Sequence, residues 1–273
     1  MMPALSDFGT AVGHRLGRGG VAVGLLRPMY AGCLRAVYGR QGLPWRLNGE
    51  ELRIDPDVRR FIPQENERPL FDYLRDGIRP GDVVFDIGAF LGTYAVMEAR
   101  WAGAGGRVVA FEPTPWSFGV LSRHLRMNGF GPDRVDARRV AVGACAGRQG
   151  LVTFEDEPYR NMIAADDPAQ AATGVETVTV DDVARQLGRT PDWIRMDVQG
   201  LEFDVLEGAR RVLDEARGHV RVVAEMHPEQ WPDFGIDPRD AHDRLAALGL
   251  RARPLTAAEP LFTESGHAIL EPL

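Results

Sequence analysis

Apolar runs of strand length recur along the chain from residue 83 onwards, and they predict the core of the fold. We assign such runs to residues 83–87, 107–111, 138–142, 193–198 and 220–226. Several are followed by stretches with apolar residues at helical spacing, as in 201–213. Strands that alternate with helices are typical of parallel βαβ units with helices on both faces of the sheet. The pattern therefore predicts an α/β fold with a doubly wound, mostly parallel sheet.

The two ends of the chain follow other patterns. The first 75 residues suggest two helical segments, a hairpin over 45–54 with Asn48-Gly49 as its turn, and a helix leading into 79–82. We therefore predict an N-terminal helical and hairpin cap over 1–75 and a main domain over 76–273. A small strand pair is expected between 151–154 and 176–180. A helix near 239–248 and strands at 251–254 and 268–271 indicate a hairpin that closes one sheet edge.

Composition and charge limit the kinds of molecule that the protein is expected to bind. The 273 residues are 44% hydrophobic and carry a formal net charge of -7, which argues against general nucleic-acid binding. Cys33 and Cys145 form neither a disulfide framework nor a metal-binding spacing. The apolar stretch 21–37 contains arginines, a proline and glycines, so we do not expect it to span a membrane. The N-terminus lacks a signal-peptide pattern, and we expect a cytoplasmic protein.

The first core strand ends in the sequence DIGAFLG, where ligands of open α/β sheets bind. A P-loop would need a longer glycine spacing and a lysine, and a dinucleotide fingerprint would need glycine in place of Asp86. A carboxylate repels pyrophosphate but suits S-adenosylmethionine (SAM), which has a sulfonium, an ammonium, a ribose diol and no phosphate. Glu112 ends the next strand, where an acid can accept both ribose hydroxyls. Alternatively, Gly88 and Gly92 only permit a tight turn and Glu112-Pro113 only caps a helix.

Acidic and basic candidates for catalysis follow the fourth and fifth strands. Asp197 ends the fourth, and strand alternation places Glu225 and His227 on one face at the end of the fifth. An alcohol must lose its proton to be methylated, and His227 is the natural base, with Asp197 and Glu225 as neighbouring acids. These three residues could also hold a divalent cation. The alternatives are that Asp197 caps the next helix and that Glu202 is an exposed first-turn acid.

Several stretches resemble the FkbM family of SAM-dependent methyltransferases. They include GDVVFDIGAFLGTYA, VVAFEPTPWSFGVLSRHLRMNG, WIRMDVQGLEFDVLEGARRVL and VVAEMHP, in the order usual for that family. The resemblance implies a seven-stranded Rossmann-like sheet whose last strand is antiparallel. It also implies an O-methyltransferase whose acceptor is a hydroxyl of a sugar or of a natural product such as a glycoside or polyketide.

The resemblance also assigns residues. It implies that Asp86, Gly88, Gly92 and Thr93 surround the methionine part of SAM, that Glu112 binds the ribose beside Pro113 and Thr114, and that Ala141 and Val142 lie against the adenine. Arg195 and Gln199 stand where the family usually has Lys and Glu. Gln199 therefore keeps open a catalytically inactive SAM-binding scaffold, and a Rossmann-type NAD(P)-dependent oxidoreductase is a further alternative. Residues 155–173 suit an acceptor-facing or a surface loop, and the N-terminal cap could form a homodimer contact.

Overall fold

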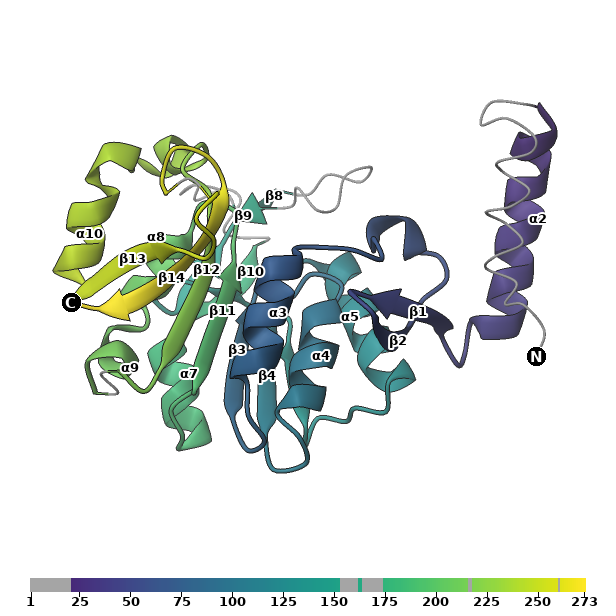
Figure 1. Ribbon diagram of the computed structural model, residues 1–273, viewed down its shortest axis with the longest axis horizontal. Coiled ribbons are helices and arrows are strands. Elements are labelled where there is room, and N and C mark those ends of the chain that lie inside the picture. Colours follow the sequence, from purple (N-terminus) through teal and green to yellow (C-terminus); the bar gives the residue numbers. More distant parts are fainter. Residues whose placement is uncertain (1–20, 153–161, 164–173, 216–217, 260) are drawn as a thin grey trace. The chain divides into compact units, whose positions relative to one another are not determined.

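The computed structural model describes residues 21–152, 162–163, 174–215, 218–259 and 261–273. The chain divides into two compact units, residues 1–66 and 67–273. In the first unit, α2 (Val21–Tyr38) precedes the antiparallel hairpin of β1 (Leu43–Leu47) and β2 (Glu50–Ile54), which the short 3-10 turn η1 (Arg59–Phe61) follows (Figure 1). Asn48 and Gly49 both have positive φ, as the tight hairpin turn requires, so the predicted hairpin is confirmed.

The division between the units falls before α3 (Arg68–Gly77), whereas the sequence places it after residue 75. Helix α3 packs against α4 (Thr93–Trp101) within the second unit. The assignment of one part as a cap and the other as a catalytic domain stays a prediction.

The second unit is built on a seven-stranded sheet of order β13-β14-β12-β11-β3-β4-β5. The strands are β3 (Val83–Ile87), β4 (Arg107–Phe111), β5 (Val135–Arg138), β11 (Trp193–Asp197), β12 (Arg221–Met226), β13 (Leu250–Pro254) and β14 (Gly266–Pro272). Strands β3, β4, β5, β11 and β12 are parallel, and β14 is antiparallel to both β12 and β13. The predicted fold class, a Rossmann-like α/β sheet with an antiparallel last strand, is confirmed.

Helices cover both faces of this sheet (Figure 1). On one face α4 packs against β3 and β4, and α5 (Pro115–Met127) packs against β5. The other face is covered by α7 (Val180–Leu187), α8 (Glu202–Glu207), α9 (Arg210–Glu215) and α10 (Ala241–Ala247). Two short 3-10 turns, η3 (Trp231–Phe234) and η4 (Pro238–Asp240), lead into α10. In the part of the chain that is described, no helix has both the length and the apolar character to cross a membrane.

Strand β3 shows how the two faces differ. Its side chains are all buried. Phe85 belongs to the apolar cluster beneath α8, and burying such a side chain contributes about 1.5–3 kcal/mol. Asp86 points the opposite way, toward α4, where burial and then the charge of Asp86 raise the pKa of Glu98 well above its usual value. One face of the sheet is thus an apolar core, and the other carries charged groups in its interior.

The third predicted strand, 138–142, is wrong. Strand β5 ends at Arg138, and Ala141–Val142 form β6 in a separate three-stranded sheet of order β6-β10-β7. In that sheet β10 (Val175–Val178) lies between β6 and β7 (Gly147–Gln149). Because β5 is an edge strand and mostly half-buried, it lacks the continuous apolar run that marks the inner strands.

Two further predictions need correction. The pairing of 151–154 with 176–180 is wrong, because β8 (Leu151–Val152) pairs with β9 (Met162–Ile163), while residues 153–154 lie outside the described residues. The helix over 201–213 is two helices, α8 and α9, separated at Gly208. A Cβ at Gly208 would lie 2.1 Å from the Gly143 carbonyl oxygen, so the chain approaches its neighbour too closely there for any side chain.

Candidate active site

Three adjacent strands bring two carboxylates and an imidazole into one row. Asp197 at the end of β11 is in register with Glu225 of β12, and Glu225 is in register with His267 of β14. Two residues earlier on β11, Arg195 is in register with Asp86 of β3. Because side chains at i and i+2 of a strand share a face, these five residues lie on the face that α4 covers.

Asp86 has a protein cation as its partner. Its carboxylate is fully buried and accepts a hydrogen bond of 2.9 Å from Arg195 Nη1, while the Arg195 guanidinium lies 4.5 Å from the centre of the Tyr94 ring. Burial raises the pKa of the Asp86 carboxyl, against the opposing charge of Arg195. Among the described residues, Asp86 Oδ2 has no hydrogen-bond partner. The predicted contact of Asp86 with a cofactor stays a prediction.

The two motif glycines are required by the backbone. Gly88 and Gly92 have φ of 81° and 76°, the left-handed region that favours glycine. A Cβ at Gly88 would lie 1.9 Å from the Asp197 carbonyl oxygen, and one at Gly92 would lie 2.2 Å from Leu121 Cδ1. Gly92 precedes Thr93, which opens α4. These glycines therefore let the loop after β3 approach both β11 and α5 closely.

The Glu112 side chain connects the loops that follow β3 and β4 through hydrogen bonds. Its Oε2 accepts a hydrogen bond of 3.0 Å from the Phe90 N–H, and its Oε1 accepts from the N–H and hydroxyl of Thr114 at 2.8 and 2.6 Å. Burial raises the pKa of Glu112 to about 7, although these hydrogen bonds oppose the shift. Thr114 is the N-cap of α5, so Glu112 and Pro113 precede the helix cap.

Ala141 and Val142, the predicted adenine contacts, lie elsewhere than the sequence suggests. Both are buried in β6, which pairs with β10, and not at the end of the third strand of the main sheet. Ala141 packs against Leu201, which immediately precedes α8. The loop residues 155–161 and 164–173, predicted to face the acceptor or solvent, lie outside the described residues.

His227 follows β12 and lies in a buried hydrogen-bond network. Its Nδ1 is 2.7 Å from Glu202 Oε1, which also accepts from the Gly200 N–H at 2.9 Å. The other oxygen of Glu202 accepts from Trp231 Nε1 at 2.6 Å. Glu202 is fully buried, so its interpretation as an exposed first-turn acid is wrong. This carboxylate makes Nδ1 of His227 the donor and leaves Nε2 to act on other groups.

Gln199 connects the histidine to the end of β11. Its Nε2 donates to Asp197 Oδ1 at 2.9 Å and lies 3.0 Å from His227 Nε2, while its Oε1 accepts from Gln230 Nε2 at 3.0 Å. Rotation of the amide would offer Oε1 to a protonated Nε2, so this side chain suits both charge states of the imidazole. The N-cap of α8 is Leu201, so Asp197 does not cap that helix.

The carboxylates around His227 control its charge. Nε2 lies 3.8 Å from Glu225 Oε1 and 3.8 Å from Asp197 Oδ1, so Glu225 and His227 do share a face, as predicted. Burial lowers the pKa of His227, but the hydrogen bond to Glu202 and the surrounding negative charges outweigh it and raise the pKa to about 9. Burial and the charge of Asp197 raise the pKa of Glu225 to about 7.

Asp197, Glu225 and His227 also have the separations that a metal ion needs, since one ligand atom from each lies within 4.8 Å of the others. The His227 Nε2 that would bind such an ion is next to the Gln199 amide. A metal at these three residues would have to displace that contact.

Sequence reasoning missed Gln230 and Trp231 of this network and the neighbouring residues Glu67 and His267, and it took the buried Glu202 to be exposed. One signal could have indicated His267. An antiparallel last strand brings its amino end to the edge where the parallel strands have their carboxyl ends, and His267 is the second residue of that strand.

The family model described as "Methyltransferase FkbM domain" matches residues 86–251. The chain belongs to the FkbM methyltransferase family. The matched region runs from Asp86 to β13 and contains all of the predicted site residues.

Two relatives of this chain have names that give their acceptors. The 31-O-demethyl-FK506 methyltransferase FkbM of Streptomyces tacrolimicus is 31% identical over 217 residues, which cover 70% of this chain and 80% of that protein. The hexuronic acid methyltransferase AglP of Haloferax volcanii is 27% identical over 208 residues, covering 76% of this chain and 73% of that protein. A crystal structure of methyltransferase FkbM from Methylobacillus flagellatus KT has a TM-score of 0.46 at 16% identity and covers 74% of this chain and 50% of that chain.

Proposed function

We propose that the protein is a SAM-dependent O-methyltransferase that acts on a hydroxyl group of a sugar or of a glycoside or polyketide natural product. The observation that carries the proposal is the buried His227–Glu202 pair at the end of β12, on the same side as Asp197 and Glu225. A histidine whose Nδ1 is held by a buried carboxylate can take the proton of an alcohol at Nε2.

The residues at the ends of β3 and β4 fit SAM. Neither 86–92 nor 112–116 contains Lys or Arg, so these loops offer no side-chain cation to a pyrophosphate. Asp86 Oδ2 is buried and without a hydrogen-bond partner among the described residues, and Glu112 is a carboxylate with lone pairs left for a ribose diol. We assign Glu112 to the ribose, with Pro113 and Thr114 beside it, and Asp86, Gly88, Gly92 and Thr93 to the methionine part. Ala141 and Val142 remain the proposed adenine contacts.

When bound, SAM supplies an electrophilic methyl group on a sulfonium. The protein's part is to align the acceptor oxygen and to remove its proton. His227 Nε2 takes that proton. Glu202 holds Nδ1 as a donor and stabilises the imidazolium that forms, much as a buried acid orients the histidine of a catalytic triad. The carboxylates of Asp197 and Glu225 are each about a quarter exposed. They lie close enough to His227 to stabilise the positive charge of the imidazolium as well.

Gln199 does not rule out catalysis. Gln199 replaces the acid that is usual at this position in the family. Its side-chain amide donates a hydrogen bond to Asp197 and contacts His227 Nε2, so it can orient the imidazole. As an amide it can both donate and accept, so it can follow the change in charge of the imidazole.

The acceptor class comes from the named relatives, which methylate a hexuronic acid in one case and demethyl-FK506 in the other. We extend these two kinds of acceptor, a sugar acid and a natural product, to this chain.

Calorimetric titration with S-adenosylhomocysteine, with NAD as the control ligand, tests the cofactor. Micromolar binding of the first and none of the second supports the proposal. Binding of NAD alone would indicate an oxidoreductase. Screening of uronic-acid glycosides and macrolides with labelled SAM then tests transfer. Binding of S-adenosylhomocysteine without turnover on any acceptor would favour an inactive scaffold.

A further inference from the structure

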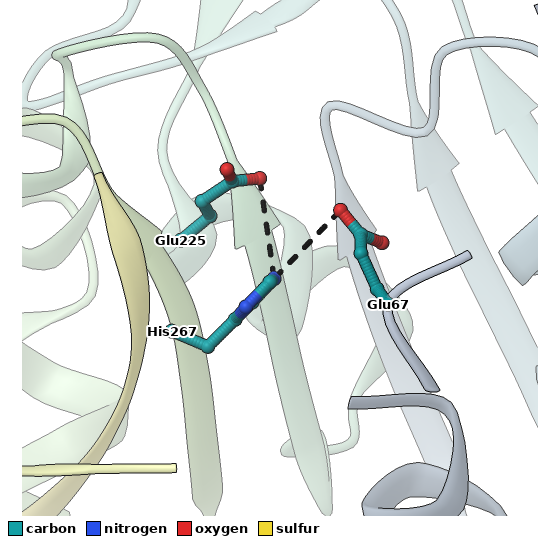
Figure 2. Close-up of side chains that lie close together, drawn as sticks. All are labelled: Glu67, Glu225 and His267. Carbon is teal, nitrogen blue, oxygen red and sulfur yellow. Dashed lines mark ion pairs between the residues drawn. The ribbon is translucent and has the colours of Figure 1, made fainter. Parts of the chain in front are cut away.

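A second cluster of potential ligands lies beside the catalytic candidates. Glu67, Glu225 and His267 each offer one ligand atom, and these atoms all lie within 4.8 Å of one another. Figure 2 shows the His267 ring directed between the two carboxylates, with Nε2 at 3.9 Å from Glu67 Oε1 and 4.0 Å from Glu225 Oε2. We propose that these three residues bind a divalent transition-metal cation of the Mn²⁺ to Zn²⁺ series.

In the described part of the chain, the imidazole of His267 lacks a hydrogen-bond partner on the side that faces the two carboxylates. His267 Nε2 is buried and has no hydrogen-bond partner among the described residues. The two carboxylate oxygens that face it are too far away for a hydrogen bond, so a proton on Nε2 would not be shared with either of them. If Nε2 carries no hydrogen, its lone pair points at two carboxylate oxygens instead. That arrangement is unfavourable unless a cation lies between the three atoms.

The separations of the ligand atoms are close to those that a metal ion needs. Ligand atoms about 2.0–2.2 Å from one metal ion, at angles between those of octahedral and trigonal coordination, lie about 2.8–3.8 Å apart. The separations of His267 Nε2 from the two carboxylate oxygens, 3.9 and 4.0 Å, are just above this range. A small inward movement of the side chains would complete the coordination. One imidazole and two carboxylates suit cations that accept both nitrogen and oxygen ligands, which favours Mn²⁺ or Zn²⁺ over Ca²⁺.

Other side chains hold two of the ligands in place. The Tyr94 hydroxyl donates to Glu67 Oε2 at 3.0 Å, and the other oxygen of Glu67, Oε1, faces the imidazole. On the far side of the ring, His267 Nδ1 is 3.5 Å from Glu259 Oε2. A carboxylate at this position favours the tautomer with hydrogen on Nδ1, in which Nε2 is free to bind a metal. Supporting groups of this kind are usual around metal ligands.

The neighbouring group formed by Asp197, Glu225 and His227 is the weaker candidate. Its imidazole Nε2 is already in contact with the Gln199 amide, whereas no such contact exists for His267 Nε2 in the described residues. Glu225 belongs to both groups, with Oε1 toward His227 and Oε2 toward His267. A metal on Oε2 therefore leaves the proposed base and its amide partner in place. Metal binding does not depend on methyl transfer.

The test uses the full-length protein after treatment with a chelator. Mn²⁺ is titrated and the free ion is measured by electron paramagnetic resonance, without SAM or acceptor. We expect one Mn²⁺ per chain and at least a tenfold loss of affinity in His267→Gln and in Glu67→Gln. Tyr94→Phe, which removes only the supporting hydroxyl, should weaken binding about 10- to 100-fold. His219→Gln, at an exposed histidine, should bind as the unmodified protein does.

Three results would overturn the proposal. They are the absence of stoichiometric binding, equal affinity in His267→Gln and the unmodified protein, and a loss in His227→Gln that His267→Gln does not share. The last would place the metal at the neighbouring group. If His267→Gln does not fold, pulsed electron paramagnetic resonance on the unmodified protein replaces it, since nitrogen coupling from an imidazole must be present. Its absence would likewise contradict the site.

Discussion

The Arg195 guanidinium donates to the Asp86 carboxylate across 2.9 Å, and both side chains are at least nine-tenths buried. Removing one partner of such a pair leaves an uncompensated charge in the interior. We expect Arg195→Met to lower the free energy of unfolding by about 3–5 kcal/mol. Arg195→Lys, which restores the residue expected from the family resemblance, should cost less, because a charge remains even though the Tyr94 ring loses a planar partner. Urea unfolding measures both.

The matched control for this prediction is Arg239→Met, because Arg239 pairs with Asp237 on the surface. It should leave the free energy of unfolding nearly unchanged. If the two methionine variants change the free energy of unfolding equally, the buried Asp86–Arg195 pair stabilises the fold no more than a surface pair does.

His227 should be needed for transfer and not for cofactor binding. We expect His227→Gln to lower kcat by about 10²- to 10⁴-fold, the usual contribution of a general base, with unchanged affinity for S-adenosylhomocysteine. His219→Gln changes an exposed histidine and should be silent in both measurements. Unchanged turnover in His227→Gln would remove this residue from the mechanism.

Methyl transfer should increase with pH. The base must be neutral, and His227 is protonated below its pKa of about 9, so kcat/KM should rise through neutral pH, reach half of its maximum near pH 9 and level off above that. Glu202→Gln removes the charged partner of Nδ1, so the inflection should move to lower pH while the maximum rate falls. The dependence of kcat/KM on pH, recorded from about pH 6 upwards for both proteins, gives the inflection pH and the maximum rate of each. An identical inflection in the two proteins would mean that another group is titrating.

Gln199→Glu tests the amide beside the imidazole. The new carboxylate would lie close to His227 Nε2 and to Asp197 Oδ1, where the amide nitrogen is now at 3.0 and 2.9 Å. Added negative charge favours the imidazolium, so we expect the inflection in kcat/KM to move to higher pH and the rate at pH 7 to fall. Gln186→Glu, at a helix residue of the opposite face of the sheet, is the control. A higher rate at pH 7 in Gln199→Glu would contradict this account.

The amino-acid pattern was sufficient for the inner strands and for the acids that end them. Asp86, Glu112, Asp197 and Glu225 follow or end buried strands, and parallel strands place such ends along one edge. Strand alternation was also enough to bring Glu225 and His227 together. Each of these inferences depends on neighbours in sequence or on a single strand.

Features that depend on packing between distant segments could not be predicted. An acid in the first turn of a helix is ordinarily exposed, and only the position of Trp231 and His227 explains why Glu202 is buried. The edge strand β5 has no apolar run to mark it. His267 was missed because the last strand was expected to begin at residue 268, and because periodicity alone does not place that strand beside Glu225.

The close approach of Gly88 to the Asp197 carbonyl has a consequence for how this enzyme can be altered. The loop after β3, which we assign to the cofactor, and the end of β11, from which Gln199 reaches the proposed base, touch through main-chain atoms with no room for a side chain between them. A substitution that shifts one loop must shift the other. Directed evolution toward new acceptors should therefore draw its variation from segments that do not touch this contact, and variants selected within 197–200 should carry compensating changes in 86–92.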